Sequence, residues 1–392
     1  MKRDWRTWAL ALLMCVPALV LYAPVVQFDF IWDDPIIFQR QLPYFDSFEN
    51  VFFPPKSIPQ FGVHYYRPVT IVSYQLDEWI AKTFWPEAER EQARQVVYHA
   101  SVVVYHGLAV LLLTVFACRL LQLGRDPTAN QALVRSCAAA GVLVFVAHPL
   151  HVESVAWMAG RTDVLCASLL LASLLAFAWL KREGGWLPFA LSMLFAFGAM
   201  LAKETGVVLL ALIPAFDLAF PDGSLGAAGK EGAVTRAERR RRQRERRGAS
   251  SRLGAQVPVT LRWGAILAVT LVYFLLRSDA VGERTLRAVA EPWTGLLGAV
   301  TWYAGKLIWP PPQSAFVYAV PSGAAVWAGA MIVVAGIVAL IWLWRRAGWR
   351  AEAIALLILG GTLAPSLMIA AFRISETPLA ERYGYIPSAG LC

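Results

Sequence analysis

Charged residues are scarce in this chain. Asp, Glu, Lys and Arg make up 16% of its 392 residues, whereas hydrophobic residues make up 58%. Soluble domains typically hold about 25% charged and about 45–50% apolar residues. This composition excludes a large soluble domain and predicts an all-α polytopic membrane protein.

Cysteine is also rare, and it forms no metal-binding or disulfide pattern. None of the five Cys residues belongs to a CxxC pair, and four of them lie in or beside apolar runs, where Cys behaves as a small hydrophobe. The sequence has no HExxH motif either. His148 and His151 have a spacing that suits metal ligation on a helix, but Pro149 disturbs the helix between them. A divalent metal is therefore left open and is not favoured.

Hydrophobic runs, by contrast, are abundant. The first run follows the basic start MKRDWR and has no small-residue cleavage site after it, so we predict an uncleaved helix with its N-terminus in the cytoplasm. Segment 295–310 is predicted to be interfacial or re-entrant, because a full span there would place the basic WRRAGWR loop outside. The nine predicted spans cover about residues 8–26, 97–121, 136–150, 162–180, 186–202, 205–220, 262–277, 324–344 and 352–372.

The net charge of +9 is distributed very unevenly. Residues 27–95 carry ten acidic and six basic side chains, whereas residues 221–262 carry eleven basic and four acidic ones, including RAERRRRQRERR. The positive-inside rule makes 221–262 a basic cytoplasmic loop and 27–95 a large first extracytoplasmic loop. An Arg run between two spans is typical of a topological anchor near anionic lipid, so we expect no nucleic-acid partner.

Five polar clusters fall on the outer face in this topology. They are WDDP (32–35), HYYRP (64–68), HPLHVESVAWMAGRTD (148–163), AKETG (202–206) and ERYGYIP (381–387). Ionisable residues are expensive at membrane depth, so their gathering on one face indicates function. A transporter would place such groups near the bilayer midplane, often in two repeated halves, and the sequence shows no such repeat.

Two acids follow the first span closely. Asp33 and Asp34 lie among Phe, Ile and Trp residues. Adjacent carboxylates repel each other, so one of them can have a raised pKa when partly buried, and an acid in this setting can serve as a general base. The alternative is a pair of solvated acids at a helix end. We favour the base, because the pair adjoins a membrane helix and aromatic residues.

Cations and further acids accompany the pair in the other outer clusters. Guanidinium and ammonium groups bind phosphate, although each cation could instead extend towards lipid headgroups, and the acids could serve only as their partners. The cations are Arg67, Arg161, Lys203 and Arg382, and the accompanying acids are Glu153, Asp163, Glu204 and Glu381.

A base and several cations at a lipid surface suit the transfer of a sugar from a lipid-linked phosphate. The base takes the proton of an acceptor hydroxyl while the phosphate leaves the sugar, and the cations stabilise the charge of the leaving group. A single displacement of this kind inverts the anomeric centre. Aromatic side chains at the interface hold the polyprenyl tail and the sugar faces.

The motifs resemble those of a known family. An Asp pair just after the first span resembles the GT-C superfamily of membrane glycosyltransferases. YYRPVTIVSYQLD, HPLHVESVAWMAGRTDVLCA, AMLAKETGVVLL and ERYGYIPSAGLC resemble motifs of the transmembrane and tetratricopeptide repeat (TMTC-type) O-mannosyltransferases and of their bacterial relatives, in order and spacing over essentially the whole chain. The resemblance implies a GT-C-like helix bundle over residues 1–392, a polyprenyl-phosphate sugar donor and a hydroxyl acceptor, Ser or Thr of a protein above all.

The resemblance also implies roles for single residues. Asp33 or Asp34 is the catalytic base, and Arg67, Arg161, Lys203 and Arg382 bind the donor phosphate. The remaining motif positions shape the site, and they are His64, Tyr66, His148, His151, Glu153, Asp163, Glu204, Glu381 and Tyr385.

Two departures from the family pattern concern the loop and the end of the chain. The Arg-rich loop has no role that we can derive. No tetratricopeptide repeats occur, and the chain stops just after an outward crossing, so we expect a fragment of a longer protein.

The resemblance places the protein in a bacterial inner membrane with a periplasmic active site. Two other functions stay open at this point. The chain could be a transporter or flippase of a lipid-linked sugar, or a scaffold that keeps the fold without catalysis.

Overall fold

Helices account for nearly all of the regular structure. In the computed structural model, the only β pairing among the described residues is a single antiparallel bridge between Val317 and Leu379. The prediction of an all-α protein is confirmed. His64 and most of the basic loop 221–262 lie outside the described residues, which are 4–37, 42–54, 65–124, 130–222, 256–281, 292–314, 317–374 and 377–391.

Six of the helices are long and apolar enough to cross a membrane, which confirms a multi-pass membrane protein. Helices occupy all nine places where spans were predicted, although the count of nine crossings itself stays a prediction. The six long helices are α1 (Trp5–Tyr22), α5 (Arg90–Gly124), α8 (Arg161–Glu183), α12 (Val259–Val281), α14 (Ala324–Arg345) and α15 (Arg350–Phe372). The shorter ones are α6 (Gln131–Ala147), α9 (Trp186–Ala202) and α10 (Leu209–Ala219).

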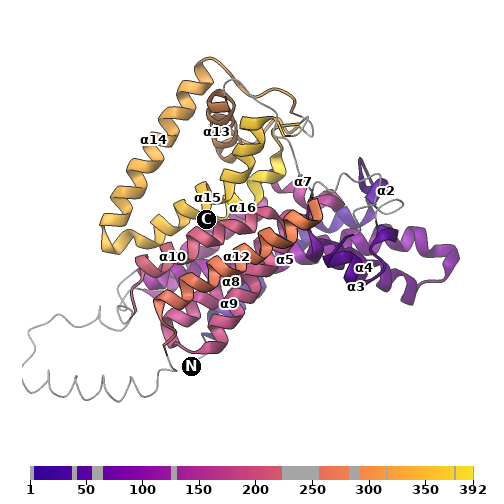
Figure 1. Ribbon diagram of the computed structural model, residues 1–392, viewed down its shortest axis with the longest axis horizontal. Coiled ribbons are helices and arrows are strands. Elements are labelled where there is room, and N and C mark those ends of the chain that lie inside the picture. The colour runs from indigo at the N-terminus through magenta and orange to yellow at the C-terminus, as the bar shows by residue number, and fades with distance from the viewer. Residues whose placement is uncertain are drawn as a thin grey trace, which may run out of the picture.

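The long helices differ greatly in how far the protein itself buries them. In the most apolar stretch of α8, 78% of the residues are buried, because α5 and α9 pack along it. The corresponding value for α14 is 6%, and this helix stands away from the bundle in Figure 1. So much exposed apolar surface on one helix requires a lipid environment.

The segment predicted to be interfacial or re-entrant forms one continuous helix, α13 (Pro292–Ile308). It packs against α14 and α15. A length of 17 residues corresponds to about 26 Å, slightly less than the hydrocarbon core of about 30 Å. How α13 lies relative to a bilayer stays a prediction.

The five polar clusters lie together at one end of the bundle. We call it the outer end after the predicted topology. It is built from short elements between the long helices, and it lies opposite the N-terminus in Figure 1. The short helices are α2 (Asp34–Ile36), α3 (Phe48–Phe52), α4 (Pro68–Phe84), α7 (His151–Ala156) and α16 (Tyr385–Ser388), and three short 3-10 turns cover Met158–Gly160, Glu204–Val208 and Glu381–Gly384.

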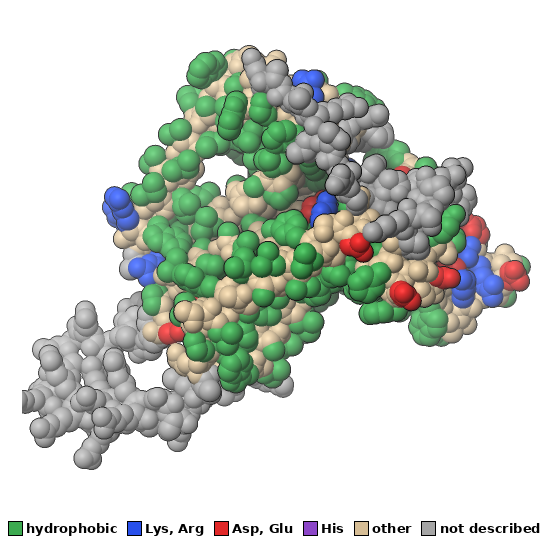
Figure 2. Space-filling model, viewed as in Figure 1, with side chains coloured by type: hydrophobic (Ala, Val, Ile, Leu, Met, Phe, Trp, Pro, Cys, Tyr) green, Lys and Arg blue, Asp and Glu red, His purple; other side chains and the backbone are tan. Residues whose placement is uncertain are grey.

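Helix α5 shows why the outer end extends beyond the apolar layer. Its 35 residues span about 52 Å, whereas the hydrocarbon core is about 30 Å thick. The first turns of α5 carry Arg90, Glu91 and Arg94, so this charged end is the part that projects. Figure 2 shows hydrophobic side chains over most of the coloured face, with charged side chains gathered at the end where α3 and α4 lie.

A second network of charges holds the opposite ends of α8, α10 and α12. Lys181 pairs with Asp217, and its Nζ lies 2.6 Å from Asp222 Oδ1. Arg262 donates to the same two carboxylates at 2.7 Å each. This inner network was not predicted from the sequence, because its four charges lie near helix ends, where charged residues usually belong to ordinary loops.

Candidate active site

The AKETG cluster turns sharply at the outer end of α9, and this turn separates two neighbouring charges. Lys203 has extended backbone (φ −158°, ψ 144°), and a 3-10 turn begins at Glu204, so the two side chains point to different partners. Gly206 permits the turn, because a Cβ atom there would lie 2.5 Å from the backbone of α9. Lys203 Nζ lies 2.5 Å from Asp163 Oδ1, in a pair that is almost fully buried.

Glu204 pairs instead with Arg67, which lies just before α4. Arg67 Nη2 donates to Glu204 Oε1 at 2.8 Å and its Nε donates to Oε2 at 3.2 Å. The guanidinium also lies 4.1 Å from the centre of the Tyr65 ring, and the Arg67 side chain keeps 19% of its surface exposed. Burial alone would raise the pKa of Glu204, but the charge of Arg67 lowers it to about 2. The bidentate pair is therefore ionised at any physiological pH.

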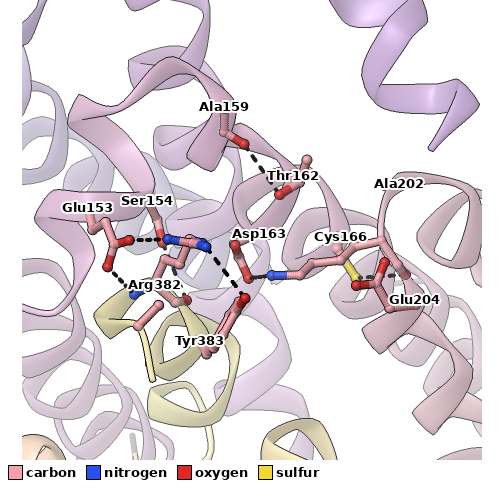
Figure 3. Close-up of polar contacts among 12 residues, drawn as sticks. Glu153, Ser154, Ala159, Thr162, Asp163, Cys166, Ala202, Glu204, Arg382 and Tyr383 are labelled. Carbon is pink, nitrogen blue, oxygen red and sulfur yellow. Dashed lines mark hydrogen bonds and ion pairs between the residues drawn. The ribbon is translucent and has the colours of Figure 1, made fainter. Parts of the chain in front are cut away.

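A third ion pair joins the C-terminal cluster to α7. Glu153 accepts the backbone N–H of Arg382 at 2.9 Å and also the Arg382 guanidinium. The guanidinium lies 4.7 Å from the Trp157 ring centre and 4.8 Å from the Tyr383 ring centre, with 20% of the side chain exposed. Lys203 Nζ also lies 4.8 Å from the Tyr383 ring centre, so this ring lies between two cations. We call this arrangement the row; it runs from Glu153 through Arg382, Tyr383, Asp163 and Lys203 to Glu204 and its partner Arg67. Figure 3 shows the part from Glu153 to Glu204.

A fourth pair involves a residue that the sequence analysis missed. Lys306, near the end of α13, lies 2.7 Å from Glu381 Oε1 and also donates to the Pro310 carbonyl at 2.9 Å. Glu381 accepts the backbone N–H of Ser314 at 3.0 Å as well. A lone Lys within an apolar segment is the signal that could have identified it.

The Asp pair divides into a buried and an exposed member. Asp34 is fully buried and accepts the backbone N–H groups of Ile31 at 3.3 Å and Ala159 at 3.2 Å. Burial raises its pKa to about 7. Asp33 is exposed as a residue, but partial burial of its carboxylate raises its pKa, although the charge of Arg382 acts in the opposite direction. Asp33 is thus within electrostatic reach of the Arg382 pair.

Helix α7 and the turn after it bring these groups together through close packing. A Cβ atom on Gly160 would lie 2.6 Å from the Glu153 carbonyl oxygen, so the GRTD motif folds directly back on α7. Trp157 projects from the same bend, and its ring packs edge-to-face on Trp32 at 5.2 Å. The glycine therefore lets Trp157 contact both the Asp33 loop and Arg382.

Arg161 does not join this row. It is fully buried, its Nη1 lies 2.5 Å from Asp77 Oδ2, and its Nη2 donates to the Tyr98 carbonyl at 2.8 Å. Its guanidinium also lies 4.4 Å from the Tyr74 ring centre. This geometry holds α8 against α4 and α5, and it fits a structural role better than the predicted phosphate binding.

The two predicted histidines of the outer loop serve as links between segments. His148 Nδ1 accepts the backbone N–H of Leu150 at 3.3 Å, so its Nε2 carries the proton that is donated to the Leu307 carbonyl at 3.1 Å. His151 is buried, with its Nε2 2.8 Å from Ser388 Oγ. Within the described ranges, no group of three His, Cys, Asp or Glu side chains is placed to hold a metal ion.

The two predicted tyrosines are buried and tie loops to helices. Tyr66 donates its hydroxyl to the Phe52 carbonyl at 3.0 Å, which fastens α3 to the start of α4. The Tyr385 hydroxyl lies 2.7 Å from His106 Nδ1, which fastens α16 to α5. Both hydroxyls hold loops in place near the ion pairs, and the predicted site-shaping role of the two tyrosines stays a prediction.

An apolar cavity of about 600 Å³ lies beside the site. Its walls come from the outer end of α1, the junction of α6 and α7, and the segment around Pro311 and Gln313. Lys306 donates to the Pro312 carbonyl within that last segment. The cavity is therefore held next to the fourth ion pair.

Sequence comparisons support the resemblance predicted from the motifs. The chain is 28% identical over 221 residues to the protein O-mannosyl-transferase TMTC4 of Mus musculus, and 28% identical over 218 residues to TMTC4 of Homo sapiens, each covering 51% of this chain. It is 29% identical over 219 residues to Tmtc2 of Drosophila melanogaster, covering 53%.

These matches involve only part of each relative. The chain spans 28% of the length of either TMTC4 and 21% of Tmtc2. No family model matches the chain, and no solved structure matches it. Fold and relatives together thus indicate a multi-pass membrane protein similar to TMTC-type O-mannosyltransferases.

Proposed function

We propose that this protein transfers a sugar from a polyprenyl-phosphate donor to a hydroxyl group, with Ser or Thr of a polypeptide as the acceptor. The observation that supports this most is the placement of Arg67 and Arg382, whose side chains are partly exposed, in one row with Lys203 and within electrostatic reach of Asp33. The names of the relatives favour mannose as the sugar.

Asp33 is the base in this proposal, and Asp34 is a positioning residue. A base must reach the acceptor proton, and we assign this role to Asp33 because it is the exposed residue of the pair, whereas Asp34 is fully buried. Asp34 accepts two backbone N–H groups and so fastens the Asp33 loop to the turn at Ala159. Its raised pKa of about 7 limits the charge repulsion next to Asp33 below neutral pH.

Arg67 and Arg382 are the phosphate ligands. A guanidinium has five N–H donors, so each can keep its carboxylate partner and still donate to a phosphate oxygen. Lys203 is almost completely buried against Asp163 and faces the Tyr383 ring, so we assign it a positioning role between the two arginines.

The reaction is a single displacement. The acceptor oxygen forms its bond to the sugar C1 while the bond from C1 to the phosphate oxygen breaks, and Asp33 takes the hydroxyl proton. The two electrons of the broken bond stay on the phosphate, whose added charge is stabilised by Arg67 and Arg382. Attack from the face opposite the phosphate inverts C1.

We infer the kind of lipid on the donor, and the side of the membrane on which transfer occurs, from the surroundings of the row. The apolar cavity of about 600 Å³ beside His148 suits the first isoprene units of the donor, because its lining is mainly Leu, Val, Phe, Ala and Pro. The acidic loop 27–95 belongs outside by the positive-inside rule, which in a bacterial inner membrane is the periplasm.

The direct test uses purified protein in lipid nanodiscs with labelled polyprenyl-phosphate mannose and Thr-containing peptides. We expect mannosylated peptide by mass spectrometry, and an inverted anomeric configuration by NMR spectroscopy of the product. Because a nanodisc has no second compartment, transfer there distinguishes an enzyme from a flippase. No transfer from any polyprenyl-phosphate sugar, with protein that stays folded, would contradict the proposal.

A further inference from the structure

A second and larger cavity lies in the extracytoplasmic part. It measures about 1330 Å³ and is bounded by α3, by one face of α4 and by the first turns of α5. Pockets for small ligands usually measure about 300–1,000 Å³. The cavity is therefore large enough for an extended ligand with several side chains.

This cavity adjoins the candidate active site. Asp29, Phe30 and Pro35 line it, and these residues flank the Asp33–Asp34 pair in the chain. Asp33 is not itself among the described lining residues, so a ligand that fills the cavity must extend past Pro35 to bring one of its groups to Asp33. The described lining residues include neither Arg67 nor Arg382, so the cavity and the phosphate ligands form separate parts of the outer end.

The walls combine an apolar stripe with negative charge. Val69, Val72 and Trp79 follow one face of α4, opposite the aromatic side chains of α3. Four carboxylates and two cations are among the described lining residues. Glu78 and Glu91 pair with the two cations, so the surplus of negative charge comes from Asp29 and Asp46.

Such a surface selects against the lipid-phosphate donor and for a polypeptide. An anionic phosphate would be repelled here and attracted by the arginines of the other part. Aromatic anchors with apolar neighbours are typical of peptide and protein interfaces. The charged first turns of α5 bound the cavity, so it lies beyond the hydrocarbon layer.

We propose that this cavity binds the acceptor, an extended hydroxyl-bearing polypeptide segment with apolar and basic residues, and presents its hydroxyl to Asp33. The inference rests on the proposed function for the identity of the acceptor, but the binding itself is a separate property. Trp79, 58% exposed on α4, is the principal aromatic anchor.

The test measures peptide binding without any donor. Purified protein in nanodiscs is titrated with fluorescent peptides that carry one Thr between apolar residues and are flanked by either Lys or Glu. The variants are Trp79→Ala, Asp46→Lys and, as the matched control, Phe84→Ala, an exposed aromatic on α4 outside the cavity lining. Thermal midpoints verify that all three variants are folded.

We expect the Lys peptide to bind more tightly than the Glu peptide. Trp79→Ala should weaken binding by about tenfold or more, as expected for loss of an aromatic anchor, while Phe84→Ala binds as the wild type does. Asp46→Lys should weaken the Lys peptide and spare the Glu peptide.

Unchanged binding by Trp79→Ala, or a preference for the Glu peptide, would overturn the inference. So would a label on Trp79→Cys that is quenched by a lipid-borne nitroxide and unaffected by peptide, because it would place this wall on the bilayer. Peptide binding as expected but without any sugar transfer would refute the proposed function and leave the peptide cavity standing.

Discussion

Buried charges lie at both ends of α8. The two groups of charges are similar in number, but they differ in how far their cations are exposed. At the outer end, α8 begins with Arg161 and Asp163, and at the inner end it closes with Lys181 in the network around Asp217. Both sets pair opposite charges at hydrogen-bond distance. Ion pairing alone therefore does not identify a functional site in this protein.

The two ends differ in how much of the surface of their cations stays exposed. In the inner network, Lys181 and Arg262 keep 1% and 2% of their side-chain surface exposed, and their donors are directed at two shared carboxylates. In the outer row, Arg67 and Arg382 keep 19% and 20%, and aromatic rings cover their faces. The outer cations remain available to a ligand, whereas the inner ones are held between helices.

The largest expected effect comes from comparing one acid at each end, Asp33 at the outer end and Asp217 at the inner end. Asp33→Asn should lower sugar transfer by about 10²–10⁴-fold, because the base is lost while its shape is kept. The matched substitution Asp217→Asn should lower the thermal midpoint and leave transfer by the folded protein unchanged. Transfer rates and thermal midpoints of both variants in nanodiscs check this. Equal transfer by the two variants would remove the functional distinction between the ends.

A second prediction concerns the buried ion pair of Arg161 and Asp77 at the outer end. Arg161→Met should destabilise the protein by about 3–5 kcal/mol, because Asp77 is left buried without its cation. The double variant Arg161→Met/Asp77→Leu should regain most of that loss. Thermal midpoints measure both effects. If the double variant stays folded but has lost donor affinity, Arg161 binds phosphate after all and the structural assignment is wrong.

A smaller effect is expected from exchanging one cation for another. Arg382→Lys keeps the charge but loses the planar guanidinium, which can donate two parallel hydrogen bonds to a phosphate. We therefore expect transfer to fall by about 10–100-fold with a raised KM for the donor. Arg262→Lys at the inner end should leave the KM unchanged. Steady-state kinetics with varied donor concentration provide the comparison, and a raised KM in both variants would point to a general effect on folding.

The smallest effect concerns Asp34. Because its folded-state pKa is raised from 3.8 to about 7, the contribution of Asp34 to the free energy of unfolding should fall as the pH rises from about 4 to about 7 and level off above that. Asp34→Asn should remove this dependence and keep transfer within about tenfold of the wild type. Thermal midpoints across this pH range measure it. A difference between wild type and Asp34→Asn that does not change across this pH range would show that Asp34 is ionised in the fold.

Much of the fold could be predicted because apolar runs record where helices cross a membrane. Each predicted span contains a helix, and the outer clusters come together as the topology requires. The observed helix boundaries differ from the predicted ones where tertiary packing determines them. Helix α5 begins at Arg90 and not near 97, since its polar first turns pack with α4 beyond the apolar layer.

The division of roles within the site could not be predicted from motifs alone. Arg161 and Arg382 both lie in family-like motifs, yet only Arg382 keeps exposed surface, because exposure depends on which helix covers the side chain. Asp33 and Asp34 are likewise identical in type, and the turn at Ala159 decides which one is buried. Lys306 was not predicted as a site residue because its partner, Glu381, is far away in the chain.

Donor binding at equilibrium tests the central claim most directly, that the outer row binds a lipid-linked phosphate while Asp33 performs the chemistry. Labelled polyprenyl-phosphate mannose is titrated into wild-type, Asp33→Asn and Arg382→Lys proteins in nanodiscs. We predict that Asp33→Asn binds the donor within about twofold of the wild type yet transfers sugar about 10²–10⁴-fold more slowly, whereas Arg382→Lys binds the donor about tenfold more weakly. Loss of donor binding in Asp33→Asn together with unchanged binding in Arg382→Lys would contradict it.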